Sequence, residues 1–213
     1  MKKLFVSLLA ALLALACAAG LAETPPDGTT LDAWAHEEGW TSFSAYTQVE
    51  VLDSAWEAAA ASFGAAVGME DLDGSTLKAL NMAACGFEDG ITTLTFSGST
   101  VTALNQAGNV VFAHAYRFVE TIDAALEGAP VYVYTTDDAQ AGQYAFLCMS
   151  LPGVASDEGG VVTNFSLRCT ELDYSALFHD SYEGVTHVLV HADTPIEDVD
   201  YTIRLVYSLG AVN

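Results

Sequence analysis

A series of short alternating segments fills the chain from residue 79 to residue 192, and it limits the possible folds more than any other feature. Apolar and polar residues alternate there with a period of two, which is typical of half-buried β-strands. Turn sequences such as Glu88-Asp89-Gly90 and Pro152-Gly153 separate the segments. Strands spaced this evenly predict a meandering antiparallel barrel or sandwich. The candidate strands are residues 79–87, 91–97, 100–104, 110–121, 131–136, 144–151, 161–170, 174–178 and 185–192.

Helices are expected on both sides of this barrel. Residues 31–63 hold all three tryptophans (Trp34, Trp40 and Trp56) and a strongly helix-forming stretch around residues 53–61. Three large aromatics so close together are expected to pack against one end of the barrel. Near the C-terminus, Thr194-Pro195-Ile196-Glu197 is a good helix start, which predicts a closing helix over residues 195–207. The fold class is therefore α+β.

The first residues predict export. Met1-Lys2-Lys3 and the apolar residues 4–19 form a signal peptide, expected to end at residue 22, with residues 23–30 as a linker and the folded domain from 31 to 213. Two processing routes are open: cleavage before Glu23, or lipid attachment to Cys17 in the degenerate lipobox Ala14-Leu15-Ala16-Cys17. No later segment is long and apolar enough to span a bilayer. We expect a periplasmic, secreted or lipid-anchored monomer.

The net charge of the mature chain limits the classes of partner that it can bind. Removing residues 1–22 leaves four basic residues against 28 acidic ones, so the formal net charge becomes −24. Nucleic acid is excluded as a partner, because nothing could neutralise its phosphates, whereas cations are attracted. Cys85, Cys148 and Cys169 lack CxxC spacing and are interpreted as small buried hydrophobes. If one disulfide bond forms, we expect it between Cys148 and Cys169.

Histidines suggest a metal site. His179, His187 and His191 lie within 13 residues, and the alternation around the last two places them on one face of a strand. Neutral imidazole is the commonest protein ligand for zinc. A divalent metal ion is therefore the expected ligand.

Three stretches resemble the ZinT/YodA family of exported, lipocalin-like (calycin) zinc-recruitment domains. They are Leu31-Asp32-Ala33-Trp34 with Trp40-Thr41-Ser42, then Leu52-Asp53-Ser54-Ala55-Trp56-Glu57, and finally Phe178-His179-Asp180 followed by Thr186-His187. The resemblance implies a lipocalin-like barrel, zinc or a similar divalent cation as ligand, and a metal transporter component as a partner.

The chain departs from the family at one ligand position. The resemblance implies zinc ligands at His179, His187 and residue 189, but residue 189 is a leucine. His191 is on the same face as His187 but roughly 13 Å along a regular strand. We therefore expect a site around His179 and His187, with a third ligand from either His191 or His114. His36 lies in an acidic segment and is interpreted as solvated.

No motif for catalysis is present, so a non-enzyme is expected. Residues 71–75 open like a calcium loop, but the glycine and glutamate that complete one are missing. Two other functions remain open. One is an acidic interaction domain with a degenerate metal site. The other is a lipocalin-like binder of a small apolar ligand, with a pocket lined by alternating aromatics: Phe112, Tyr116, Phe118, Tyr132, Tyr134, Tyr144 and Phe146.

Overall fold

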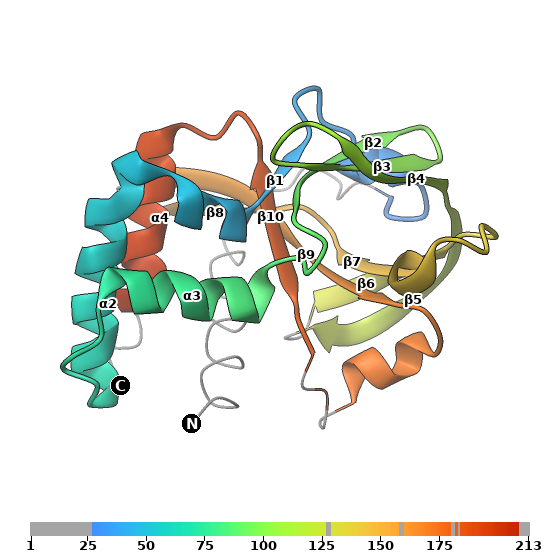
Figure 1. Ribbon diagram of the computed structural model, residues 1–213. Coiled ribbons are helices and arrows are strands. Elements are labelled where there is room, and N and C mark those ends of the chain that lie inside the picture. The colour runs from blue at the N-terminus through green and yellow to red at the C-terminus, as the bar shows by residue number, and fades with distance from the viewer. Residues whose placement is uncertain (1–26, 127–128, 158–159, 180–181, 183, 209–213) are drawn as a thin grey trace.

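The computed structural model describes residues 27–126, 129–157, 160–179, 182 and 184–208, and the signal peptide and Cys17 lie outside these residues. A group of helices lies on one side of the molecule and a β-barrel on the other (Figure 1). Strands β1 and β10 run between the two parts, so the sheet is shared by both. The expected α+β fold with an antiparallel, nearly closed barrel is confirmed.

The sheet is antiparallel throughout the described pairings, with the strand order β4-β3-β2-β1-β10-β9-β7-β6-β5 and with β8 paired to β9. Its two ends, β4 and β5, adjoin a seam in the barrel wall. Strand β1, from the start of the chain, pairs with both β10 and β2, and this brings the two ends of the chain together. The strands are β1 (Trp40–Ser42), β2 (Ile91–Ser97), β3 (Thr100–Asn105), β4 (Val110–Ala115), β5 (Arg117–Leu126), β6 (Ala129–Thr135), β7 (Phe146–Ser150), β8 (Gly153–Asp157), β9 (Gly160–Thr170) and β10 (His187–His191).

The helices are α2 (Asp53–Val67), α3 (Gly74–Cys85) and α4 (Ile196–Ser208), together with the short 3₁₀ helices η1 (Leu31–Trp34), η2 (Phe43–Gln48), η3 (Glu50–Leu52), η4 (Gly142–Tyr144) and η5 (Tyr174–Phe178). Helix α4 lies within one residue of the expected closing helix at both ends. No described helix combines the length and apolar character needed to cross a bilayer.

Three expected strands differ from the structure. The strand expected at 79–87 is wrong, because residues 74–85 form α3: the Asp73 carboxylate caps it by accepting from the Thr76 N–H at 2.7 Å. Its buried positions, Leu77, Asn81 and Ala84, follow helical spacing rather than alternation. The strand expected at 174–178 is also wrong, because η5 occupies it. The long strand expected at 110–121 is split at Tyr116 into β4 and β5.

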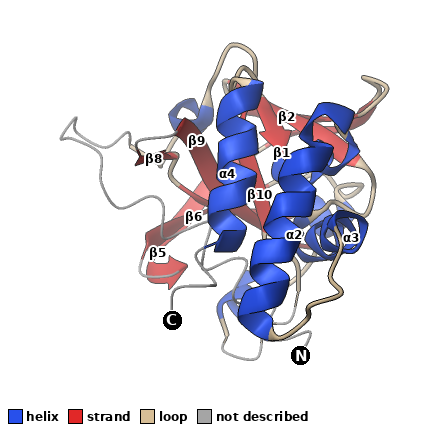
Figure 2. Ribbon diagram, turned by 90° about the vertical axis from the view of Figure 1, so that its left-hand side faces the viewer, coloured by secondary structure: helices blue, strands red, loops and turns tan. Residues whose placement is uncertain are grey.

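Strand β10 separates two hydrophobic layers. Val188 and Val190 pack among the helices, and α2 and α4 lie side by side in front of β10 in Figure 2. Leu189, on the opposite face of the strand, belongs to the cluster that fills the barrel. Because both faces of this strand are buried, its sequence is almost continuously apolar between the two histidines.

The tryptophans are buried as expected, and they are divided between the two layers. Trp34 and Trp40 belong to the barrel cluster and Trp56 to the helical one. Trp34 is fully buried, and its indole N–H donates to the carbonyl of Ser150 at 2.9 Å on the barrel wall. Tryptophan thus fills the barrel interior itself.

The three described cysteines are free thiols. Cys148 and Cys169 lie on the paired strands β7 and β9, but Cys148 is opposite Arg168 and Cys169 is opposite Leu147. Since neighbouring positions on a strand point to opposite faces, the two sulfurs lie on opposite sides of the sheet. The expected disulfide between them is therefore wrong.

Candidate metal centre

Strand β10 places His187 and His191 on one face, as the alternation predicts, with Leu189 between them. Each nevertheless has different neighbours. His187 is opposite Leu167 of β9, whereas His191 is opposite Trp40 of β1. The two histidines therefore have to be considered as separate environments.

His187 is a core histidine. Its side chain stacks on Phe87, with ring centroids 3.7 Å apart and planes within 6°, and its Nδ1 lies 3.2 Å from the carbonyl oxygen of Cys85. Burial lowers the pKa of His187 to about 4, although the hydrogen bond to Cys85 acts in the opposite direction. The ring is therefore neutral at physiological pH, but a backbone carbonyl already engages one nitrogen.

The other positions implied by the family resemblance do not complete a site around His187. His179 is exposed at the end of η5, and the Leu189 side chain is fully buried between Ser42 and Phe165 in the strand register. Among the described residues, neither His179 nor His187 belongs to a group of three ligands with converging donor atoms.

His114 is engaged elsewhere. It lies on β4, stacks on Phe112 at 5.2 Å, and its Nδ1 is 3.0 Å from Oδ2 of Asp138. The pKa of Asp138 lies below its usual range, because the N–H of Gln140 and the ring of His114 both hydrogen-bond to the carboxylate. This histidine therefore forms a pair with a carboxylate at the barrel seam, far along the sheet order from β10.

A different trio converges. His36, His191 and Asp193 each offer one ligand atom, and these atoms all lie within 4.8 Å of one another. Nε2 of His36 is 3.7 Å from Oδ1 of Asp193, and the two imidazoles stack with centroids 3.8 Å apart and planes within 20°. It is the one group of this kind among the described residues. Of the four histidines expected as ligands, only His191 belongs to it.

The trio is assembled by the pairing of β1 with β10. His36 lies in the loop before β1, and His191 and Asp193 lie where β10 ends and the chain turns toward α4. Gly39 directs the loop into β1 with a φ of +76°, and a side chain there would meet the carbonyl oxygen of Leu94 at 2.8 Å. Its own carbonyl accepts from the N–H of Ala192 at 3.0 Å, which joins the loop to the turn.

Trp40 packs against both histidines of the trio. Its ring lies 4.3 Å from the His191 ring and 6.3 Å from the His36 ring, and its indole N–H donates to the Trp34 carbonyl at 2.7 Å. Burial and the neighbouring His36 lower the pKa of His191, and Asp193 opposes this shift. The shift favours the neutral form of the His191 imidazole, which is the form that binds metals.

The donor set fits a divalent transition metal. Two imidazoles and one carboxylate form the N₂O set found in several catalytic zinc sites, and they leave a coordination position open. Nε2 of His36 is the nitrogen near Asp193, whereas its Nδ1 is buried without a hydrogen-bond partner. Since lone pairs lie in the ring planes, the nearly parallel rings must first turn relative to one another before both can bind one ion.

The sequence reasoning missed His36 and Asp193. His36 follows a 3₁₀ turn rather than a solvated helix, and β1 has only three residues, too few for a periodic signal. Asp193 stands two residues after His191, a His-x-Asp spacing that brings an imidazole and a carboxylate close together at a strand end. That spacing was the signal available in the sequence, but the third member of the trio, His36, lies 155 residues before His191.

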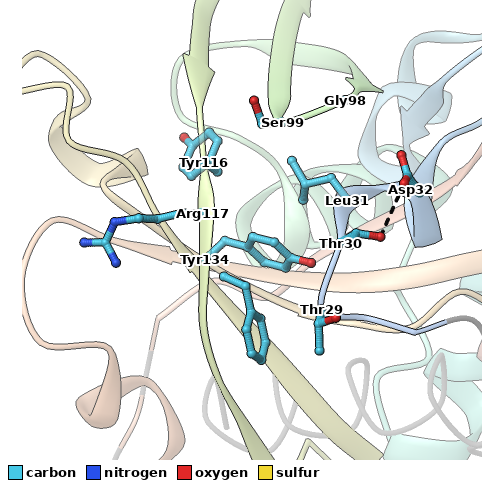
Figure 3. A pocket seen from close by; sticks show the side chains of 10 residues that line it. Thr29, Thr30, Leu31, Asp32, Gly98, Ser99, Tyr116, Arg117 and Tyr134 are labelled. Atoms are coloured by element: carbon cyan, nitrogen blue, oxygen red, sulfur yellow. Dashed lines mark hydrogen bonds between the residues drawn. The ribbon is translucent and has the colours of Figure 1, made fainter.

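Cavities at the barrel seam test the apolar-ligand alternative. One of about 350 Å³ has a mixed lining, in which the polar Thr30, Asp32, Ser99 and Arg117 stand beside Leu31, Tyr116 and Tyr134 (Figure 3). A second, of about 400 Å³, lies beside His114 and Asp138. Trp34 fills the barrel interior, where its ring contacts Phe96, Tyr134 and Phe165 at centroid distances of 5.8 to 6.4 Å.

The helices and the nearly closed antiparallel barrel form a lipocalin-like α+β fold. Among solved structures, the chain is similar to the Zn(II)-bound ZinT-like domain of AdcA from Streptococcus pneumoniae, with a TM-score of 0.53 and 14% identity, covering 87% of this chain and 96% of that one. It is also similar to Zn(II)-bound AdcA of the same organism, with a TM-score of 0.53 and 13% identity, covering 89% of this chain but only 37% of that longer one. No protein-family model and no curated protein matches. The expected likeness to ZinT-like domains is therefore confirmed for the fold.

Proposed function

We propose that this chain is an exported protein that captures a divalent metal ion, zinc above all, through His36, His191 and Asp193. The convergence of two imidazoles and a carboxylate within 4.8 Å carries the proposal. Zinc favours this donor set over the oxygen-only sets that suit calcium and magnesium. His191 is the ligand that this site shares with the sequence-based expectation.

The surroundings of the trio favour a cation over other ligands. Its carboxylate is half-exposed, with Asp193 retaining 55% of its side-chain accessibility, so an ion can enter from solvent. The mature chain carries an excess of 24 negative charges, which raises the local concentration of cations. Export through the predicted signal peptide would place the protein where zinc must be captured before uptake, with a transporter component as the receiving partner.

Binding rather than catalysis is the proposed role. Solved structures with this fold include Zn(II)-bound ZinT-like domains. Filling of the barrel by Trp34 disfavours the apolar-ligand alternative. An acidic interaction domain with a degenerate site remains the competing function, and it differs from the proposal in one measurable respect, zinc affinity.

The test is a zinc titration of the mature protein at pH 7.5 in competition with a chromogenic chelator. Loss of one direct ligand should weaken binding by more than the 10–100-fold typical of second-shell changes. We expect such losses for His36→Gln, His191→Gln and Asp193→Asn. His114→Gln is the matched control, because this histidine also pairs with an aspartate but lies at the seam. Unchanged affinity in the first three variants, or no zinc binding by the parent, would overturn the proposal.

A further inference from the structure

The members of the trio come from two parts of the chain that meet where β1 pairs with β10. Residues 27–39, here called the plug segment, precede β1 and carry Trp34 and His36. The other two ligands, His191 and Asp193, belong to the turn between β10 and α4. In Figure 1 this turn arches from the top of β10 to the top of α4.

The plug segment is attached to the barrel by side chains. Besides the indole bond of Trp34 to Ser150, the Tyr134 hydroxyl donates to the Gly28 carbonyl at 2.6 Å. The N–H groups of Ala33, Ala35 and Gly39 donate to carbonyls within the segment, whereas the Gly39 carbonyl accepts from the Ala192 N–H of the turn. Strand pairing begins only at Trp40. The part of the segment before Gly39 can therefore leave the barrel without breaking a strand pairing or the bond between Gly39 and Ala192.

The turn, in contrast, is firmly placed. Both the N–H and the hydroxyl of Thr194 donate to the carbonyl of His191, at 3.1 and 2.7 Å. Helix α4 follows directly and buries Val199, Ile203 and Val206 in the helical layer. The ligands on this side of the trio are thus fixed to the helical layer.

We propose that a bound metal ion acts as a clip that fastens the plug segment to the β10–α4 turn, and so controls how often the barrel interior opens. This inference rests on the proposed function. His36 is the only member of the trio on the plug segment. An ion therefore connects the plug segment to the turn only when it binds His36. When the plug segment lifts, the site breaks, and ligand binding therefore opposes lifting by mass action.

Hydrogen exchange measured by mass spectrometry tests the clip. With free zinc at 100 times its dissociation constant, exchange that requires the plug segment to lift should slow by up to about 100-fold. The amides to follow are those of Ala33, Ala35 and Gly39. Amides of α3 are the internal control, because its local opening does not break the trio, and their exchange should change much less.

Two variants separate the clip from simple binding, each measured at its own saturating zinc concentration. Asp193→Asn should keep the slowing, because His36 and His191 still bridge the plug segment and the turn. His36→Gln should lose it, because the remaining ligands are both on the turn. If zinc binds the parent through the trio but slows the plug segment no more than α3, the clip is wrong and the proposed function stands. If the parent binds no zinc, both fail.

Discussion

Acid should destabilise this protein through His187, and the size of the effect follows from its burial. The pKa of His187 is lowered from 6.5 to about 4 in the folded chain. Between these two pH values the unfolded chain is therefore protonated at this histidine and the folded chain is not. The stabilisation is complete above pH 6.5 and is lost as the pH falls toward 4. Between pH 7.5 and pH 5.0 this single group should remove about 2 kcal/mol from the free energy of unfolding.

The assay is urea unfolding of the metal-free mature protein at several pH values between 5.0 and 7.5. His187→Asn removes the titrating ring and keeps a side-chain donor for the Cys85 carbonyl. It should be less stable at every pH, because the stack on Phe87 is lost, but its stability should fall by about 2 kcal/mol less than that of the parent across this range. His179→Asn, at an exposed position, controls for the general effect of removing a histidine. Equal pH slopes for the parent and His187→Asn would refute the reasoning.

Three further substitutions test the parts of the fold that support the trio. Gly39→Ala should lower the unfolding free energy by about 1–3 kcal/mol, because the added methyl group meets the Leu94 carbonyl. The same substitution should also lower the zinc affinity. Gly108→Ala is the control: Gly108 has a φ of +77° but open space around it, so this variant should lower stability and leave zinc affinity unchanged. Trp34→Ala should cost about 3–5 kcal/mol in urea unfolding, since it empties the barrel centre. Leu189→His should destabilise the barrel without raising zinc affinity in the chelator assay; a tight new site would instead show that His179 and His187 can form the family's arrangement.

Much of the barrel could be predicted because its strands repeat one simple pattern. Alternation located β2, β3, β6, β7 and β9, and the capping sequence before residue 196 located α4. The last turns of helix α3 were mistaken for a strand because residues 79–87 are almost all apolar or small. What distinguishes them is the Asp73 cap, a single hydrogen bond that a period-two pattern does not register.

The candidate site was harder to predict because it depends on pairing between distant parts of the chain. Alternation correctly placed His187 and His191 on one face, but whether two histidines on one strand share a metal depends on what lies between and beside them. Leu189 fills the space between, and the loop before β1 supplies a stacking imidazole, His36, beside His191 only. A strand of three residues leaves no periodic trace, so His36 could not be joined to His191 before the register of the sheet was known.

The most direct test of the metal centre is anomalous diffraction at the zinc absorption edge from crystals of the mature protein grown with zinc. We expect a single strong peak about 2.1 Å from one imidazole nitrogen each of His36 and His191, with a carboxylate oxygen of Asp193 at a similar distance. The stack of the two rings should be opened in that structure. A peak bound by His179 and His187, or no peak at the trio while zinc is bound elsewhere, would contradict it.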